Sequence, residues 1–216
     1  MSKEQFYKIA LPDGWDFFTG NTINYRNNIG KLVRCPTKGK AKLCTSTVIH
    51  ASRDPNQCFI GGSIPCSLYL VEGNPIVEDK QKGGFKQLRV LRELDPAKVF
   101  QWRYEEACSP VRPFDIKPPK QITEQHLVLL KTWASVWDSV WDSVGDSVGD
   151  SVRAYIGYIF EPVVTTWKYI DHQVGEYPFQ PAVDLWKMGL VPSFDGKVWR
   201  LHGGKDAKIL WEGQKP

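Results

Sequence analysis

Apolar residues in the first half of the chain form short runs that alternate with turn-forming residues. Pro, Gly, Asn and Asp cluster between these runs, as they do in proteins built of short strands. Within residues 4–30, aromatic-rich runs at 15–18 and 22–25 predict a β-hairpin or a small meander. Residues 54–59 are predicted to begin a short helix. Further strands are predicted at residues 31–35, 43–50, 67–71, 75–77 and 85–94. We therefore expect a mainly β domain with some helix over residues 1–109.

The second half is dominated by a four-residue repeat over residues 133–152. Its units read Trp-Ala-Ser-Val once, Trp-Asp-Ser-Val twice and Gly-Asp-Ser-Val twice. A strand would mix polar and apolar side chains on both faces, whereas a helix gathers Trp and Val into one stripe. We therefore predict one long helix over residues 122–160, with Thr123 as its N-cap. From Thr123 to Gly157, where a kink or an end is expected, this helix would span roughly 50 Å.

The repeat would give this helix a polar face. Aspartates recur every four residues with serines beside them, at Asp138, Asp142, Asp146, Asp150, Ser139, Ser143 and Ser147. Such a face is typical of a solvated helix surface, and the alternative is a polar ladder that lines a binding groove, coordinates cations or hydrogen-bonds a partner helix. Asp, Ser, Val and Gly are weak helix formers, so the helix is expected to depend on packing against the rest of the protein.

Prolines separate the two halves of the chain. Four of the ten residues from 110 to 119 are proline, which fixes φ and lacks a backbone donor. We therefore predict a linker at residues 110–121.

The segment after the repeat is predicted to be a small helix and hairpin that packs back on the rest. Residues 181–190 have the pattern of a short helix. Residues 197–201 and 208–211 alternate like a hairpin that turns at a Gly-Gly-Lys-Asp sequence. With residues 161–216 assigned in this way, the predicted fold class is α+β. Its parts are a mainly β N-terminal unit, one long repeat helix and a C-terminal helix–hairpin.

The charge, the cysteine content and the length of the apolar stretches argue against several classes of function. The chain has a formal net charge of +4, and its basic excess lies before residue 121. Five basic residues gather around one Pro- and Gly-containing loop, at Lys31, Arg34, Lys38, Lys40 and Lys42. Since no nucleic-acid motif accompanies them, we interpret this loop as solvated and do not expect a nucleic-acid partner. The five cysteines lack metal-site spacing, which predicts reduced thiols and no metal site. The apolar stretches are too short for a signal peptide or a membrane span, so we expect a cytoplasmic protein.

The polar residues near the end of the predicted strand 43–50 form a candidate ligand site. Thr45, Ser46 and Thr47 offer hydroxyl groups, and His50 lies close to Arg53 in the sequence. Such residues can orient a phosphate, and a histidine there can also act as a general base. The alternative is that the hydroxyl residues form an ordinary strand and the histidine bonds a loop backbone. Motifs for nucleophile elbows, phosphate loops, zinc proteases and dinucleotide binding are absent from the sequence.

Several segments resemble a family of small phage and bacterial proteins. They are Val-Ile-His-Ala-Ser at 48–52, Val-Glu-Gly at 71–73, Glu-Asp-Lys at 78–80, the repeat, and the runs at 180–186 and 191–202. The resemblance covers most of the chain. It implies a phage-associated protein in the host cytoplasm, and it implies no activity.

The order of elements around residues 45–47 is also similar to that of the NAD-binding half of ADP-ribosyltransferases. In this resemblance, residues 45–47 stand for the element that orients the nicotinamide ribose, and Arg34 stands for an upstream arginine. It implies NAD or another nucleotide as a cofactor. The family's catalytic glutamates are missing, because Lys-Gln-Leu-Arg occupies positions 86–89. Glu72 and Glu78 are the available substitutes.

We therefore predict a non-catalytic, phage-associated binding or interaction protein with a nucleotide-like ligand near residues 45–53. The missing glutamates favour this prediction over the alternative of an NAD-using, ADP-ribosyltransferase-like enzyme. A third hypothesis is a virion or other structural protein that self-associates through the repeat helix. The expected partner is accordingly an unidentified protein or a second copy of the chain, with no membrane involved.

Overall fold

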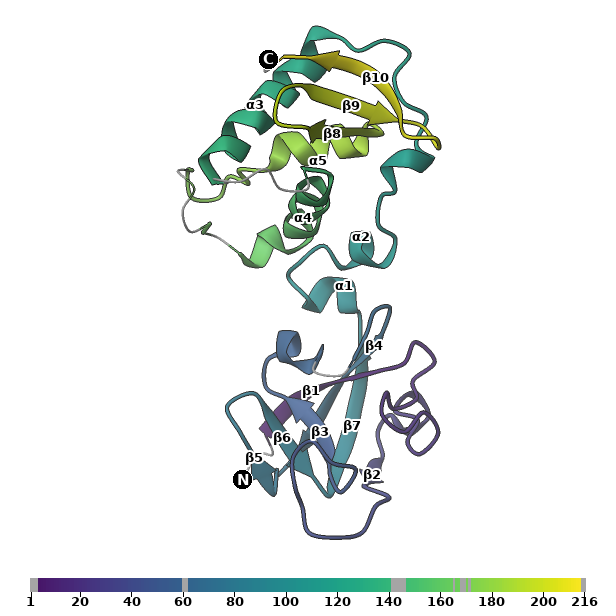
Figure 1. Cartoon of the computed structure of the whole chain (residues 1–216). Helices are drawn as coiled ribbons and strands as arrows, with labels where there is room; N and C mark the ends of the chain where they lie inside the picture. Colours follow the sequence, from purple (N-terminus) through teal and green to yellow (C-terminus); the bar gives the residue numbers. More distant parts are fainter. Residues whose placement is uncertain are drawn as a thin grey trace. The chain divides into compact units, whose positions relative to one another are not determined.

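The chain forms two compact units, Met1–Tyr104 (unit 1) and Glu105–Pro216 (unit 2). The computed structural model describes residues 4–59, 62–140, 147–164, 166–167, 170 and 172–214, without the side chains of 137–140 and 147–148. Each unit contains helices and an antiparallel sheet (Figure 1). The predicted α+β fold class is confirmed.

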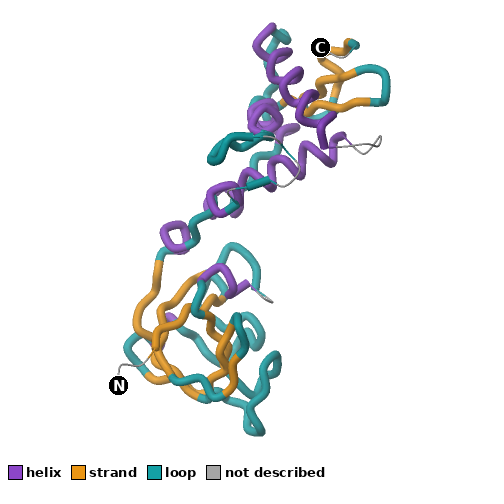
Figure 2. Tube along the Cα trace, turned by 90° about the vertical axis from the view of Figure 1, so that its left-hand side faces the viewer, coloured by secondary structure: helices purple, strands orange, loops and turns teal. Residues whose placement is uncertain are grey.

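Unit 1 is built on one seven-stranded antiparallel sheet, with the strand order β2-β7-β4-β1-β3-β6-β5. In chain order the strands are β1 (Glu4–Ala10), β2 (Leu32–Arg34), β3 (Ile49–Ser52), β4 (Ser67–Gly73), β5 (Val77–Glu78), β6 (Lys82–Phe85) and β7 (Gln87–Leu94). Short helical segments complete the unit at η1 (Arg26–Asn28), η2 (Pro55–Phe59) and α1 (Pro96–Val99). Figure 2 shows the sheet as strongly curved.

One face of this sheet encloses the core of unit 1. Alternate residues of neighbouring strands meet there, as the two-residue period of a strand requires. Phe6 of β1 lies opposite Val71 of β4, which in turn lies opposite Val90 of β7, and all three are fully buried. Ile23 and Tyr25, from the segment between β1 and β2, join the same cluster. This segment therefore covers the core rather than forming a separate hairpin.

The strand predictions for unit 1 are confirmed in part. The strands predicted at 31–35, 67–71 and 85–94 correspond to β2, β4 and β7, and the helix predicted from residue 54 to η2. The strand predicted at 43–50 is largely wrong, because residues 43–48 form turns and bends and β3 begins at Ile49. Cys44 has φ 60°, which no regular strand accommodates. The pairing predicted within residues 15–25 is limited to one bridge, between Trp15 and Asn24.

Unit 2 combines helices with a three-stranded antiparallel sheet of order β10-β9-β8. Its elements are α2 (Tyr104–Cys108), which begins in unit 1, then η3 (Pro113–Asp115), α3 (Glu124–Val140), α4 (Ser147–Phe160), η4 (Glu161–Val163), α5 (Gln180–Lys187), β8 (Leu190–Phe194), β9 (Trp199–Gly203) and β10 (Lys208–Gly213). The predicted short helix is confirmed by α5, and the predicted hairpin by the β9–β10 pair. Trp133, Leu185 and Trp199 lie in the core of this unit.

The repeat region does not form the single long helix predicted over residues 122–160. The structure describes two helices, α3 and α4, and residues 141–146 between them lie outside the described residues. Leu130 of α3 and Ala154 of α4 belong to one core cluster with Leu185 of α5. On one straight helix the first two would be about 36 Å apart, and α5 is only about 12 Å long. Both helices nevertheless pack on α5, so their axes do not continue one another.

The proline-rich segment 110–121, predicted as a linker, lies inside unit 2. The Val111 N–H donates to Tyr155 Oη at 2.8 Å, and the Val111 carbonyl accepts from Trp186 Nε1 at 2.9 Å. Pro113 is buried at the start of η3. Among the described residues, no helix has the length and apolar character that a membrane span requires.

Candidate functional site

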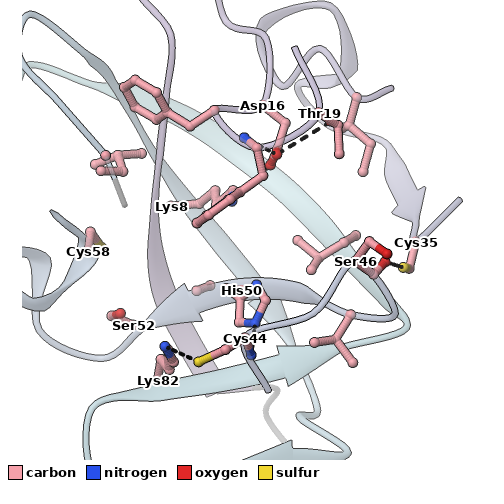
Figure 3. Close-up of a pocket in the computed structure, with 18 of the residues that line it drawn as sticks. Lys8, Asp16, Thr19, Cys35, Cys44, Ser46, His50, Ser52, Cys58 and Lys82 are labelled. Carbon is pink, nitrogen blue, oxygen red and sulfur yellow. Dashed lines mark hydrogen bonds and ion pairs between the residues drawn. The ribbon is translucent and has the colours of Figure 1, made fainter. Parts of the chain in front are cut away.

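Unit 1 contains a cavity of about 420 Å³ (Figure 3). Its walls come from β1, the loop at residues 16–23, the loop at residues 35–48, β3 and η2, and Lys82 at the start of β6 lines it as well. Most of the lining is apolar, with aromatic rings from Phe17 and Phe18. Polar and charged side chains stand among the apolar ones, and a mainly apolar surface with such groups is typical of a small-molecule site.

Hydrogen bonds fix the loop before β3 against the cavity. The backbone N–H of Cys44 donates to His50 Nε2 at 2.9 Å. The Thr45 hydroxyl donates to the Lys42 carbonyl at 2.8 Å and lies 2.7 Å from the Thr47 hydroxyl. Ser and Thr side chains that bond nearby backbone groups in this way stabilise turns in place of strands. The hydroxyl groups of Thr45 and Thr47 therefore stabilise the turn that forms this part of the cavity wall.

A buried ion pair crosses one side of the cavity. Lys8 Nζ lies 2.9 Å from Asp16 Oδ2, and their side chains are 7% and 10% exposed. Asp16 also accepts from the Tyr25 hydroxyl at 2.9 Å and from the Phe18 N–H at 3.0 Å. Burial alone would raise the pKa of Asp16, but the charge of Lys8 and these hydrogen bonds outweigh it and lower the pKa. The two charges neutralise each other.

Lys82 supplies a second buried cation. The residue is 9% exposed, and its Nζ donates to Cys44 Sγ at 3.1 Å. Among the described residues it forms no ion pair. The carboxylate of Asp79, on the same hairpin, instead accepts from the backbone N–H groups of Gln81 and Lys82, each at 2.8 Å. The ammonium group therefore has a sulfur atom as its direct partner.

His50 lines the cavity as a neutral ring. Burial lowers its pKa to about 4, and the charges of Lys8 and Lys82 contribute to the shift. Because Nε2 accepts from the Cys44 N–H, the proton of the neutral ring is on Nδ1. Among the described residues Nδ1 has no hydrogen-bond partner, so its N–H is available to a ligand. The Phe18 ring lies 6.2 Å from the His50 ring, centroid to centroid, and is 66% exposed.

The residues predicted for the ligand site divide into two groups. Thr45, Ser46 and His50 line the cavity. Thr47 bonds within the turn and does not line it, and Arg34 is exposed on β2.

Arg53 also lies away from the cavity lining. Its guanidinium bonds Glu4 at 2.6 Å and Glu78 at 2.8 Å. Its charge is therefore already paired at the protein surface.

Four residues of the site were missed by the sequence interpretation: Lys8, Asp16, Cys44 and Lys82. Each is a residue that the sequence alone places at a solvent-exposed loop or strand edge, although Lys8 lies between Tyr7 and Ile9 and Asp16 between Trp15 and Phe17. Only the fold brings them together, since Lys8 and Lys82 come from β1 and β6 on either side of β3. The one local signal is the Gly83-Gly84 pair after Lys82, because glycines inside a strand often mark the close approach of another group.

Of the residues predicted to form the polar face of the repeat helix, the structure describes the side chain of one, Asp150. Asp150 is 3% exposed and pairs with Arg153 at 2.6 Å, so it does not lie on a solvated face. The other predicted positions lie outside the described side chains: Asp138, Asp142, Asp146, Ser139, Ser143 and Ser147. Among the described residues, no three His, Cys, Asp or Glu side chains are grouped to hold a metal ion.

Comparison with known proteins returned no relatives: no family model matches the chain, and neither does any curated protein or solved structure.

Proposed function

We propose that unit 1 binds a small molecule that combines a negatively charged group with a flat apolar body, the chemistry of a mononucleotide. The observation that carries this proposal is Lys82, a buried ammonium without a carboxylate partner among the described residues. A buried charge is costly unless an opposite charge or several hydrogen bonds satisfy it. An anionic group on a ligand would supply that charge, and the His50 Nδ1–H would donate a further hydrogen bond.

The size and walls of the cavity support the same ligand class. A volume of about 420 Å³ falls within the range of about 300–1,000 Å³ that small-molecule sites occupy. The exposed Phe18 ring offers a surface on which a base can stack. Since Lys8 is neutralised by Asp16, one net positive charge remains among the Lys, Arg, Asp and Glu side chains that line the cavity. One anionic group per ligand is therefore favoured.

Thermal melting with matched ligand pairs tests the proposal. The panel comprises nucleosides and their monophosphates, cyclic nucleotides, NAD, ADP-ribose and inorganic phosphate. A ligand at about 100 times its Kd adds about 2.7 kcal/mol to the stability of the unit that binds it. We expect a phosphorylated compound to raise the melting temperature by several degrees and its nucleoside to have a much smaller effect.

Two variants assign any shift to the cavity. Lys82→Met should abolish the stabilisation by the phosphorylated ligand, whereas Lys80→Met removes an exposed charge from the same hairpin and should preserve it. Equal shifts with a nucleoside and its monophosphate would contradict the role of charge. No shift with any compound of the panel would reject the nucleotide-like class.

The alternative functions find less support. Glu72 pairs with Arg89 and Glu78 pairs with Arg53, and neither glutamate lines the cavity. No observation therefore favours ADP-ribosyltransferase-like chemistry. Self-association through the repeat rests on side chains that lie outside the described residues, so it has no structural argument behind it.

A further inference from the structure

Cys44 differs from the other four cysteines in its surroundings. All five lie in the described part of the chain, and Cys44 is the exposed one. Cys35 Sγ donates to the Ser46 carbonyl at 3.2 Å, and Cys58 Sγ donates to the Tyr7 carbonyl at 3.2 Å. A thiol that donates in this way retains its proton, and burial raises the pKa of Cys58 to about 11. Both thiols line the same cavity, and Cys58 is held in its protonated, unreactive form.

The sulfur of Cys44 instead accepts a hydrogen bond from a cation. Lys82 Nζ lies 3.1 Å from it, and the lysine is held in place by its own burial. A charged donor at this distance stabilises negative charge on the sulfur, which is the state that attacks electrophiles.

The backbone presents Cys44 in a conformation that side chains rarely adopt. Its φ is 60°, and the hydrogen bond from its N–H to His50 Nε2 maintains it. Non-glycine residues in this region persist only where the surroundings hold them, and such residues concentrate at functional sites. In Figure 3, Cys44 lies between Lys82 and His50.

We propose that Cys44 is a modification site that takes up small, negatively charged thiols as mixed disulfides. The reactant is a low-molecular-weight disulfide, which is also the oxidant. The deprotonated Sγ of Cys44 attacks one sulfur of the disulfide, a new S–S bond forms, and the old S–S bond breaks. Its electron pair leaves on the second sulfur as a thiolate, and the proton originally on Cys44 goes to solvent. Cys44 is oxidised and the departing sulfur is reduced.

The charge of the cavity determines which disulfides react fastest. While Cys44 is a thiol, Lys82 carries the one positive charge among the described cavity-lining residues that no carboxylate offsets, because Lys8 is paired with Asp16. The mixed disulfide then consumes the thiolate, so Lys82 faces the captured thiol with a charge that the sulfur no longer offsets. An anionic disulfide is therefore attracted to the site, and a cationic one is repelled. This inference concerns a covalent reaction, so it stands whether or not a nucleotide binds.

The test measures disulfide exchange on the fully reduced, full-length protein. The probes are the anionic 5,5′-dithiobis(2-nitrobenzoate) and the cationic cystamine, each normalised to its rate with a free thiol in solution. Peptide mass mapping locates the first label. We expect it on Cys44, with a normalised rate about tenfold higher for the anionic probe than for the cationic one.

Variants distinguish the effect of the Lys82 charge on the labelling rate from general effects of mutation. Lys82→Met should slow labelling of Cys44 about tenfold, Lys82→Arg should retain most of the rate, and Lys80→Met should leave it unchanged. Cys44→Ser should remove the fast phase, whereas Cys35→Ser should not. A fast phase that survives Cys44→Ser would overturn the inference, as would equal normalised rates for the two probes on the unmodified protein. The second comparison needs no variant, so it decides the question even if Lys82→Met fails to fold.

Discussion

His50 shows how the charges of the cavity act on a single residue. Burial is the largest cause of the fall in its pKa to about 4, and the charges of Lys8 and Lys82 lower the pKa further, against opposing effects of Asp16 and Asp79. A protonated ring would be a third cation in this space, and its Nε2 could no longer accept from the Cys44 N–H. The neutral ring is thus part of what holds the loop before β3.

The stability of unit 1 should therefore fall on acidification between pH 6.5 and 4. In the unfolded chain His50 takes up a proton near its ordinary pKa of 6.5, and in the folded protein near 4. Between these values the unfolded state binds more protons, so the contribution of His50 is present above pH 6.5 and is lost as the pH falls. Urea unfolding at a series of pH values measures it.

The matched control for this prediction is His50→Gln, which keeps a side-chain acceptor and does not titrate. We expect the stability of His50→Gln to change less with pH across this interval than that of the unmodified protein. Asp16 does not interfere with this comparison. Its pKa in the folded protein is lowered from 3.8, so its protonation changes the stability of unit 1 only at more acidic pH. Parallel pH curves for the two proteins would show that His50 is not the titrating group.

At the scale of elements, Gly157 is a packing residue of α4. The sequence suggested a kink or an end there, but α4 continues to Phe160. A Cβ atom at residue 157 would lie 2.4 Å from Tyr177 Oη and 3.3 Å from the Trp167 ring. Tyr177 Oη also donates to the carbonyl of Ala154, so it cannot move away without losing that bond.

Gly157→Ala should therefore destabilise unit 2. In an exposed helix the same change gains about 1 kcal/mol of helix propensity, whereas overpacking a core costs about 1–3 kcal/mol. We expect the clash to prevail and the free energy of unfolding to fall, as measured by urea denaturation.

A double-mutant cycle with Tyr177→Phe tests the cause. Removing Oη relieves the closest contact, so Gly157→Ala should cost less in the Tyr177→Phe background than in the unmodified protein. An equal cost in both backgrounds would mean that the hydroxyl group is not the obstacle.

Elements with a regular apolar period could be predicted from the sequence, and elements that depend on distant partners could not. β4, β7, α5 and the β9–β10 hairpin follow from their own residues. β1 was missed because Lys8 interrupts its apolar face, and the Asp16 carboxylate that compensates the charge comes from a loop. β6 was missed because Gly83 and Gly84 resemble a turn.

The glycines of β6 have a packing role that the sequence does not reveal. A Cβ at residue 84 would lie 2.7 Å from Val77 and 3.0 Å from Val48, so the strand has room only for glycine at that position. The candidate site, too, could be predicted from the sequence only in part. Thr45, Ser46 and His50 could be named from local chemistry, whereas the contact between Cys44 and Lys82 joins two segments 38 residues apart.

At the scale of the whole molecule, the two units differ in charge as well as in core. Unit 1 has 16 basic and 9 acidic residues and a net charge of +7, and unit 2 has 12 basic and 15 acidic residues and a net charge of −3. The cavity lies in the basic unit, as does Lys82, which forms no ion pair within the described part of the chain. A positive potential raises the local concentration of anions, which suits the ligand class that we propose.

Each unit also has a core made of its own residues, which predicts two separable unfolding transitions. Leu88 belongs to the core cluster of unit 1 and Leu185 to that of unit 2, and both are fully buried. Replacing either by alanine should cost about 2–5 kcal/mol. Hydrogen exchange followed by mass spectrometry reports the two units separately, because each peptide is assigned to its own unit.

We expect Leu88→Ala to lower the protection of unit 1 peptides and leave unit 2 unchanged, and Leu185→Ala to do the reverse. If either substitution lowers protection in both units equally, the chain unfolds as one cooperative body and the division into units has no thermodynamic meaning. Separate transitions would also sharpen the ligand test. A compound bound in the cavity should then raise the melting temperature of the transition that Leu88→Ala lowers, and it should leave the other transition in place.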